Sequence, residues 1–221
     1  MGLPALAPCV RGYAAPVPRQ NRVLPTGEIV AIAERGTLMG NRGVLHDEAG
    51  RIVRPWQTRR WIACRTEFRG RWRPIMAPRR WTELFFLDEA TALAAGHRPC
   101  AHCRHADYQR FKAAWLAAHD VPGARAETID RALHADRIGE GRGKRTHLAQ
   151  LAALPDGAIV ELEGAPWLVL EDRLARWSPV GYGERRARPA RARVAVLTPR
   201  GIVAVLRAGF EPGLHPSAPH G

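Results

Sequence analysis

The sequence predicts an α+β fold: a small β-rich module with short helices, followed by a small C-terminal β-rich domain that ends in a helix. Three observations support this fold class. Short apolar runs separated by Gly and Pro before residue 88 are typical of strands. Apolar residues at helical spacing between residues 89 and 138 indicate amphipathic helices. Strand-like runs return after residue 155 and lead to a segment with clear helix start and stop signals.

The chain of 221 residues is long enough for one domain or for two small ones. Shifts in composition and in periodicity divide it into four predicted parts. These are a Pro-rich extended arm (1–25), a β-rich module with short helices (26–123), a helical connector (124–154) and a C-terminal β-rich domain with a terminal helix (155–221).

The first half of the chain is predicted to be mainly β-structure, followed by helices. Short strands are expected at 28–33, 44–45, 60–64, 73–76 and 83–87. Asp88 is a favourable N-cap for a short helix at 89–95, and Gly96 is a favourable residue to end it. An amphipathic helix is expected at 107–119 and another at 126–138.

The second half begins with a Gly-rich loop at 139–147. This loop is not a nucleotide-binding phosphate loop, because Arg145 follows Lys144 where that motif needs Ser or Thr. A short helix is expected from Leu148, and an Arg-rich loop at 181–193. Strands are expected at 158–162, 167–170, 174–177 and 194–197.

The last predicted helix has the clearest end signals in the chain. Thr198 is expected to be its N-cap, with Pro199 at the first helical position. Gly209 is expected to follow its last turn.

Composition excludes several classes of protein. Hydrophobic residues make up 46% of the chain and charged residues 25%, which is typical of a globular protein. No apolar run approaches the ~18 residues that a membrane-spanning helix needs. The N-terminal region has many prolines and no continuous apolar segment of the kind found in secretory signals. We therefore expect a cytoplasmic protein that does not insert into membranes.

The charge is strongly positive and unevenly distributed. Lys and Arg number 34 against 21 acidic residues, which gives a net charge of +13. All but Lys112 and Lys144 are arginines; coding bias explains this preference but not the deficit of acids. The segment 51–82 contains ten arginines and one acid, Glu67. A localised excess of this size predicts a polyanionic partner, most commonly nucleic acid.

Four tryptophans, at positions 56, 61, 72 and 81, alternate with these arginines. Arginine binds phosphate through two parallel hydrogen bonds, and indole offers a face on which an exposed base can stack. The alternative is that the tryptophans belong to the core and the arginines form a solvated face. The predicted nucleic-acid contacts are Arg59, Arg60, Arg65, Arg69, Arg71, Trp72, Arg73, Arg79 and Arg80.

The cysteines indicate a metal site. Cys100 and Cys103 form a Cys-x-x-Cys pair, whose spacing suits a metal ion better than a disulfide in a reducing compartment. The alternatives are two buried thiols or a redox pair. Structural zinc takes four N or S ligands, and Cys64 would be the third. His105 is the favoured fourth ligand; the other candidates are His46, His97, His102 and Cys9.

One stretch, LFFLDEATALAAGHRPCAHCR at 84–104, resembles the second half of the metal-binding domain of Ada-type DNA alkylation-repair regulators. The resemblance implies that Cys100 and Cys103 are zinc ligands. In that family a further Cys-x-x-x-Cys turn provides two more ligands, and its first Cys accepts a methyl group from a DNA phosphotriester. Cys64 matches this acceptor position, and Phe68 replaces its partner cysteine. We therefore expect Cys64 to bind zinc and not to be an efficient methyl acceptor.

These observations predict a zinc-containing DNA-binding protein that acts on damaged or modified DNA, either single-stranded or as a damaged duplex. The first alternative is a DNA-processing enzyme, a nuclease or a base-repair enzyme. Its candidate acid–base groups would be His134, Asp136 and His147, but the first two lie about 200° apart on a helix. The second alternative is a basic RNA-binding or interaction module without catalysis. The sequence does not predict an oligomeric state.

Overall fold

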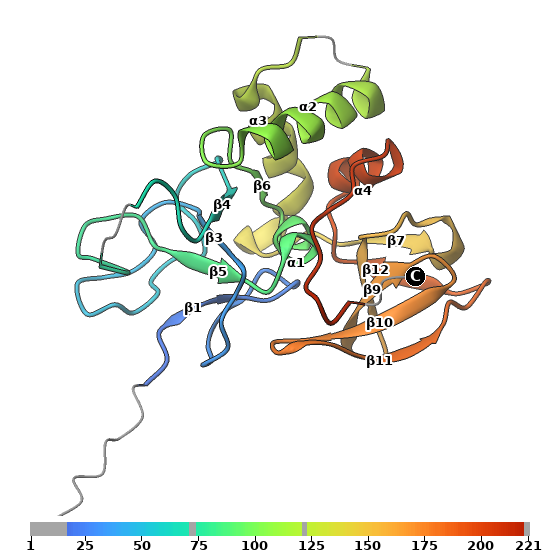
Figure 1. Ribbon diagram of the computed structural model, residues 1–221, viewed down its shortest axis with the longest axis horizontal. Helices are drawn as coiled ribbons and strands as arrows, with labels where there is room; N and C mark the ends of the chain where they lie inside the picture. Colours follow the sequence, from blue (N-terminus) through green and yellow to red (C-terminus); the bar gives the residue numbers. More distant parts are fainter. Residues whose placement is uncertain (1–16, 71–73, 121–122, 219–221) are drawn as a thin grey trace, which may run out of the picture.

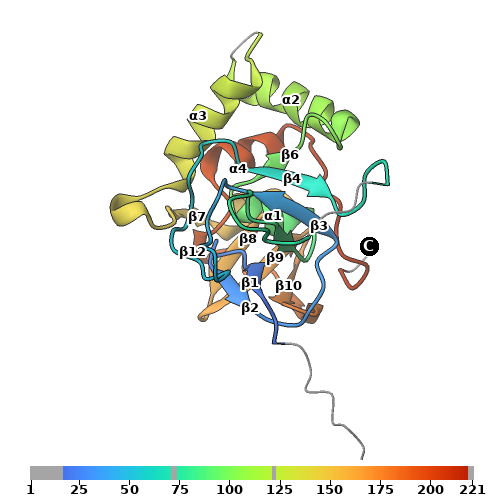
Figure 2. The same ribbon diagram turned by 90° about the vertical axis from the view of Figure 1, so that its left-hand side faces the viewer.

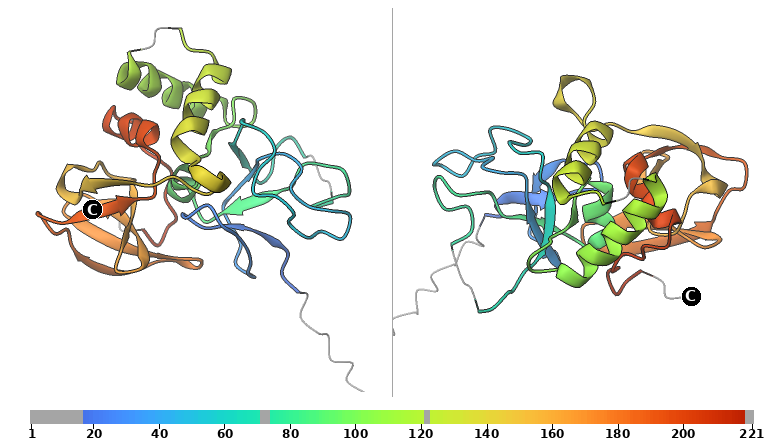
Figure 3. Two further views of the ribbon diagram at one scale, coloured as in Figure 1. Left: turned by 180° about the vertical axis from the view of Figure 1, so that it is seen from behind. Right: turned by 90° about the horizontal axis from the view of Figure 1, so that it is seen from above.

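A computed structural model describes residues 17–70, 74–120 and 123–218. Within these residues the chain forms two six-stranded sheets and four α-helices (Figure 1), so the predicted α+β class is confirmed. The two sheets lie on opposite sides of the first helix, and the other three helices gather along one end of the molecule (Figures 1 and 3). No helix among the described residues is long and apolar enough to cross a bilayer.

The first sheet comes from the N-terminal half of the chain, and its strand order is β2-β1-β5-β3-β4-β6. Its strands are β1 (Gln20–Val23), β2 (Ile29–Ala31), β3 (Leu38–Asn41), β4 (Ile62–Arg65), β5 (Leu84–Phe86) and β6 (Arg98–Pro99). Two neighbouring pairs, β1 with β5 and β4 with β6, are parallel, and the other pairs are antiparallel. Figure 2 looks onto this sheet, with α1 and the second sheet behind it.

The second sheet comes from the C-terminal half and is antiparallel throughout, with the order β11-β10-β9-β8-β12-β7. Its strands are β7 (His147–Gln150), β8 (Ile159–Leu162), β9 (Ala165–Leu170), β10 (Arg173–Ser178), β11 (Gly181–Ala187) and β12 (Arg193–Val196). The helices are α1 (Glu89–Ala94), α2 (His105–His119), α3 (Ala126–Arg137) and α4 (Arg200–Arg207), and single 3-10 turns occur at Glu140–Arg142 and Leu151–Ala153.

Helix α1 lies between the two sheets, and every one of its residues is buried. Ala92 packs with the first sheet, and Ala90 and Ala94 pack with the second. Its small alanines let both sheets approach it closely, and its buried carboxylate, Glu89, is paired with Arg104. The predicted N-cap is confirmed, because the Asp88 carboxylate accepts a hydrogen bond of 2.8 Å from the Thr91 N–H.

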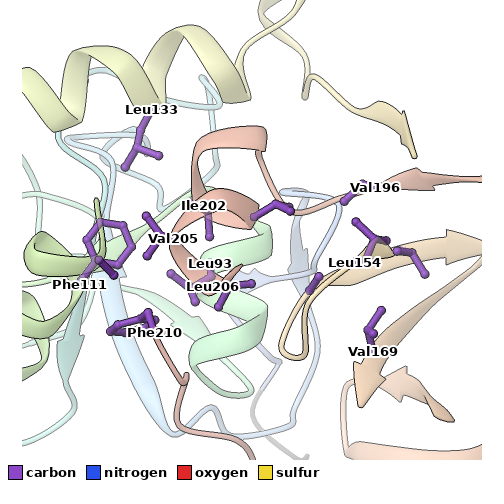
Figure 4. Packing of buried hydrophobic residues seen from close by; sticks show 14 of the residues in the cluster. Leu93, Phe111, Leu133, Leu154, Val169, Val196, Ile202, Val205, Leu206 and Phe210 are labelled. Carbon is purple, nitrogen blue, oxygen red and sulfur yellow. The ribbon is translucent and has the colours of Figure 1, made fainter. Parts of the chain in front are cut away.

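The largest hydrophobic cluster joins α2, α3 and α4 to the second sheet (Figure 4). Phe111 of α2 contacts Phe210 edge-on, with ring centres 5.4 Å apart, while Leu133 comes from α3 and Ile202 from α4. Leu93 of α1 belongs to the same cluster. Helix α1 therefore joins this cluster to the first sheet, which has its own cluster around Leu84 and Phe86.

Polar contacts also join the two halves at Asp88. In addition to capping α1, its carboxylate accepts hydrogen bonds from the Tyr182 hydroxyl of β11 at 2.8 Å and from the His215 N–H at 3.1 Å. Burial and the Asp88 charge raise the pKa of Tyr182 well above its usual value, so this hydroxyl remains a donor.

The N-terminal sheet differs from the prediction in three places. Residues 20–23 of the expected extended arm form β1. Strand β3 was not expected; it contains Gly40, where a Cβ would lie 2.2 Å from the Ile62 carbonyl oxygen, so glycine permits close approach of β4 here. The strands expected at 44–45 and 73–76 are wrong for the described residues: 44–45 has no strand pairing, 74–76 lies in a turn, and Arg73 falls outside the described residues.

Two predictions in the second half are also wrong. The helix expected from Leu148 is strand β7, which is held by antiparallel pairing with β12. The Arg-rich loop expected at 181–193 begins as strand β11, because Arg185 and Arg186 pair with β10 across the edge of the sheet. Charged residues suit such an edge strand, since they oppose pairing with other chains.

The last helix has a different start from the one predicted. Its N-cap is Pro199, not Thr198. The Thr198 hydroxyl instead accepts a hydrogen bond of 2.9 Å from the Ile159 N–H of β8. The Asp136 carboxylate of α3 accepts the Gly201 N–H at 2.6 Å, which supplies an acceptor at the first turn of α4. Gly209 follows the helix at a positive φ of 93°, as expected for its end.

Candidate metal centre and arginine-rich surface

The structure brings together the three cysteines that the sequence indicated. Cys64 is in β4, and Cys100 and Cys103 lie in the turn that follows β6. Because β4 and β6 are parallel neighbours, the Cys100 N–H donates to the Ala63 carbonyl at 2.9 Å. The three sulfur atoms lie within 4.8 Å of one another, and all three side chains are buried. This group can hold a metal ion.

Hydrogen bonds within the group already favour a thiolate. The pKa of Cys100 is lowered to about 4, chiefly because the Cys64 thiol donates a hydrogen bond to its sulfur, with backbone N–H groups adding to the effect. The same hydrogen bond raises the pKa of Cys64, and burial raises the pKa of Cys103. Metal binding would displace the protons that the remaining thiols carry.

The Cys-x-x-Cys turn is fixed by ion pairs on both sides. Arg98, two residues before Cys100, binds both carboxylate oxygens of Asp130 in α3, each at 2.8 Å. Arg104, directly after Cys103, binds Glu89 of α1 at 2.8 Å. All four of these charged side chains are at most 7% exposed. The turn is therefore attached to two helices by buried, charge-assisted contacts.

All three cysteines also line a pocket of about 910 Å³. Met39, Ile62 and Phe68 pack against them, and the Phe68 ring meets His102 edge-on with centres 5.1 Å apart. Arg19, Asn41 and Glu83 line the same pocket, and sequence analysis did not indicate them. They come from separate segments that only the sheet brings together, and no motif marks them. The metal group is thus reached from an open pocket.

His105, the favoured fourth ligand, does not join the group. Its ring is exposed, with Nδ1 3.1 Å from the Ala101 carbonyl and Nε2 3.3 Å from the Gln109 amide. His97 lies among Arg42, Trp61 and Phe86, and the His46 ring contacts the Thr82 hydroxyl. Among the described residues, no fourth His, Cys or carboxylate lies with the three cysteines. Two candidates remain. His102 packs against Phe68, and Cys9 lies outside the described residues.

The predicted nucleic-acid contacts are mostly at the surface. Six of them are exposed, namely Arg59, Arg60, Arg65, Arg69, Arg79 and Arg80. Arg60 and Arg65 line the pocket that contains the cysteines. Arg79 forms an exposed ion pair with Glu48 at 3.2 Å. The other three, Arg71, Trp72 and Arg73, lie outside the described residues.

The tryptophans of this segment divide between core and surface. Trp61 is 4% exposed and belongs to the core, so it cannot stack with a base. Trp81 is partly buried and lines the cysteine pocket. Trp56 is partly buried, lies beneath the Arg142 guanidinium at 4.2 Å, and meets the His134 ring edge-on.

The acid–base set considered for the enzyme alternative is not assembled. Asp136 accepts the Gly201 N–H at the start of α4, whereas His134 packs against Trp56. Burial and the Arg200 charge lower the pKa of His147, which lies in β7, while the nearby Asp136 charge raises it. Asp136 and His147 are therefore neighbours, whereas His134 packs separately against Trp56. The chain matches no protein-family description, no curated protein and no solved structure, and its function is therefore inferred from the geometry of its own sites.

Proposed function

We propose that the chain is a zinc-containing DNA-binding protein that acts on damaged or modified DNA. The observation that carries the proposal is the shared pocket: Cys64, Cys100 and Cys103 line it together with Arg60 and Arg65. A metal ion and a DNA phosphate would therefore bind at the same pocket.

Zinc fits the donor set. Thiolate sulfur is a preferred zinc ligand, and Zn–S distances of about 2.3 Å in a tetrahedron place sulfurs about 3.8 Å apart. The sulfurs here lie within 4.8 Å of one another, so a small rearrangement of side chains completes three bonds. Cys64, Cys100 and Cys103 would hold the ion, and Met39 and Phe68 pack against them at the pocket.

DNA fits the surface and the pocket. The exposed arginines offer paired N–H donors to phosphate oxygens. Phe68 and Trp81 provide aromatic surface inside the pocket, on which an unpaired base can stack. Enzymes and receptors that examine single bases take them out of the helix, at least cost where the base is damaged or unpaired. A pocket of about 910 Å³ has room for one such nucleotide.

The test is metal analysis of the purified protein, followed by DNA binding at several salt concentrations. Labelled single-stranded, duplex and alkylated DNA should bind, and RNA should bind less well. If five or six arginines reach phosphates, log K should fall with log salt at a slope of about −4 to −5 on duplex.

Variants can locate the contact surface. The triple variant Arg60→Ala, Arg65→Ala, Arg69→Ala should flatten the salt slope by up to about three units and weaken binding to all sequences. Arg173→Ala, on an exposed arginine of β10 in the other sheet, is the matched control and should leave the slope unchanged. Equal binding by the triple variant and the parent at low and high salt would refute the proposed DNA surface.

A second candidate, a DNA-processing enzyme, is favoured by one observation. Among the described residues the metal group has three protein ligands, and catalytic zinc sites keep one position open in the same way. Incubation of alkylated and unmodified DNA with the metal-loaded protein, with a chelator-treated sample as control, distinguishes the candidates. Metal-dependent cleavage or loss of the modified base supports the enzyme, and binding alone supports the DNA-binding protein.

A further inference from the structure

A second pocket, of about 190 Å³, is lined by Trp61 and contains a group of cations. Arg42 follows β3, Arg137 ends α3, and Lys144 lies in the Gly-rich loop. All three line this pocket, which we call the basic pocket. Its remaining lining is Thr26, Gly27, Glu28, Pro55, Trp56, Trp61, Ala95, Ile138, Arg142 and Gly143.

The two arginines are buried without a counter-charge. Arg42 is 2% exposed and Arg137 is 1% exposed. Arg42 donates to the Gly27 carbonyl at 3.0 Å, and Arg137 donates to the Gly96 carbonyl at 2.8 Å. Among the described residues, no carboxylate oxygen lies within ion-pair distance of Arg42, Arg137 or Lys144.

Each buried guanidinium also has an unused donor. Nη2 of Arg42 and Nε of Arg137 have no hydrogen-bond partner. The unused Arg42 donor faces the pocket wall at Gly27, where an added Cβ would lie 4.0 Å from Nη2 and 3.9 Å from Cδ of Lys144. A buried donor without a partner carries the full cost of its desolvation. These atoms therefore identify a place where an acceptor is missing.

The groups packed against the two guanidiniums are aromatic or neutral and supply no negative charge. The guanidinium carbons of Arg42 and Arg137 each lie 4.1 Å from the centre of the Trp61 ring. Nε of Arg42 faces His97, whose pKa is lowered well below its usual value by burial and by the nearby cations, so this histidine is neutral. The Lys144 ammonium donates to the Ala94 carbonyl.

The nearest acids do not neutralise the group. Asp130 binds Arg98 through both oxygens, and Glu28, at the pocket lining, is exposed and accepts from the Thr26 hydroxyl at 3.3 Å. Arg142 adds a further positive charge at the lining, stacked on Trp56. Arg59 contributes its backbone carbonyl to Arg137.

We propose that the basic pocket binds a phosphoryl group. Guanidinium forks match the spacing of phosphate oxygens, and a lysine at the lining adds a point charge. Two or three buried cations favour a dianion over a monoanion such as chloride or a carboxylate. A pocket of about 190 Å³ has room for one phosphate. The phosphate can be free or can be the end of a nucleotide or nucleic-acid chain. The proposal does not depend on the metal centre or on DNA binding.

Lys144 provides the variant for the test. It is half-buried and contributes one charge, so Lys144→Met removes a cation without opening the core. The two neighbouring guanidiniums repel this ammonium, and the variant should therefore melt at the same or a higher temperature than the parent in phosphate-free buffer. Lys112→Met, on α2, is the matched control, since Lys112 and Lys144 are the two lysines of the chain.

Isothermal titration with inorganic phosphate, at matched ionic strength with chloride as the reference ion, should show one site per chain in the parent and in Lys112→Met. Lys144→Met should bind phosphate at least about tenfold more weakly than the parent, because it loses a charge-assisted hydrogen bond. The absence of saturable phosphate binding by the parent would overturn the proposal. Equal affinity of Lys144→Met and Lys112→Met would also overturn it.

The source of the phosphate is distinguished by three further ligands: a mononucleotide 5′-phosphate, a 5′-phosphorylated oligonucleotide and the same oligonucleotide with a 5′-hydroxyl. Tighter binding of the phosphorylated oligonucleotide than of its 5′-hydroxyl form, lost in Lys144→Met, assigns the site to a nucleic-acid end. Equal affinity for inorganic phosphate and the mononucleotide assigns it to the phosphate alone. Binding of all ligands that is insensitive to Lys144→Met would place the phosphate elsewhere and refute the pocket.

Discussion

The buried ion pair between Arg98 and Asp130 should be essential for stability, and Asp130→Ala is the perturbation that tests it. The two side chains are 2% and 7% exposed, and two hydrogen bonds of 2.8 Å join them. Removing one member of a buried pair leaves the other charge without compensation, which costs about 3–5 kcal/mol of unfolding free energy. Arg98 would keep one bond, to the Pro99 carbonyl at 3.0 Å, and its stacking on Tyr108.

The same chain contains a matched exposed pair. Arg79 and Glu48 lie 3.2 Å apart with side chains 87% and 73% exposed, and such pairs contribute about 0–1 kcal/mol. Glu48→Ala should therefore have almost no effect on the unfolding free energy. The difference between the two variants should be about 2 kcal/mol or more.

Urea denaturation of the parent, Asp130→Ala and Glu48→Ala measures both effects, with an unchanged m-value as evidence that the cost lies in the native state. The double variant Arg98→Met, Asp130→Leu should recover most of the lost stability, because replacing a whole buried pair by apolar residues is often neutral. If Asp130→Ala costs no more than Glu48→Ala, the pair is not the anchor of the Cys-x-x-Cys turn.

Three further predictions follow from the sites. The purified protein should carry about one zinc ion per chain by elemental analysis, and Cys100→Ser or Cys103→Ser should lose the metal and lower the melting temperature; a stable, metal-free parent would contradict this. After incubation with methyl-phosphotriester DNA, mass spectrometry should find no stoichiometric methyl group on Cys64, because Phe68, at the spacing where the resembled Cys-x-x-x-Cys turn has its second cysteine, provides no thiolate. Burial and the charges of its two arginine neighbours lower the pKa of Lys144 to about 7. Between about pH 7 and pH 10 the unfolded chain therefore binds more protons than the folded chain. The difference in unfolding free energy between the parent and Lys144→Met should change in favour of the parent as the pH rises across that window. A difference that does not change with pH would contradict the burial of this lysine.

The features that were predicted correctly depend on residues that are close together in the sequence. Asp88 and Gly96 mark the two ends of α1. The Asp88 carboxylate accepts an N–H at the start of the helix, and Gly96, at a positive φ of 89°, follows its end. The Cys-x-x-Cys spacing predicted the metal group because two ligands three residues apart share one turn. Cys64 could be added because few other cysteines were available.

Long-range pairing determined what the sequence could not predict. The segment from His147 to Gln150 is a strand because β12 lies beside it, and the arginines of β11 are strand residues because β10 accepts them. The fourth ligand was assigned to His105 by proximity in sequence. Helix α2 begins at that residue, two positions earlier than predicted, and turns the ring toward Ala101.

The basic pocket shows why the net charge was only a partial guide to binding. The largest local excess of arginine lies in 51–82, where the described arginines are exposed and can contact a partner's phosphates at a small cost in desolvation. Arg42, Arg137 and Lys144 are separated by 95 and 7 positions in the sequence, and no local excess of charge marks them. Burying such cations costs several kcal/mol each, and stacking on Trp61 returns about 2 kcal/mol or less per arginine. The folded chain therefore keeps an unfavourable local charge that an anion would relieve, and this imbalance, not the number of basic residues, is the stronger indication of a ligand.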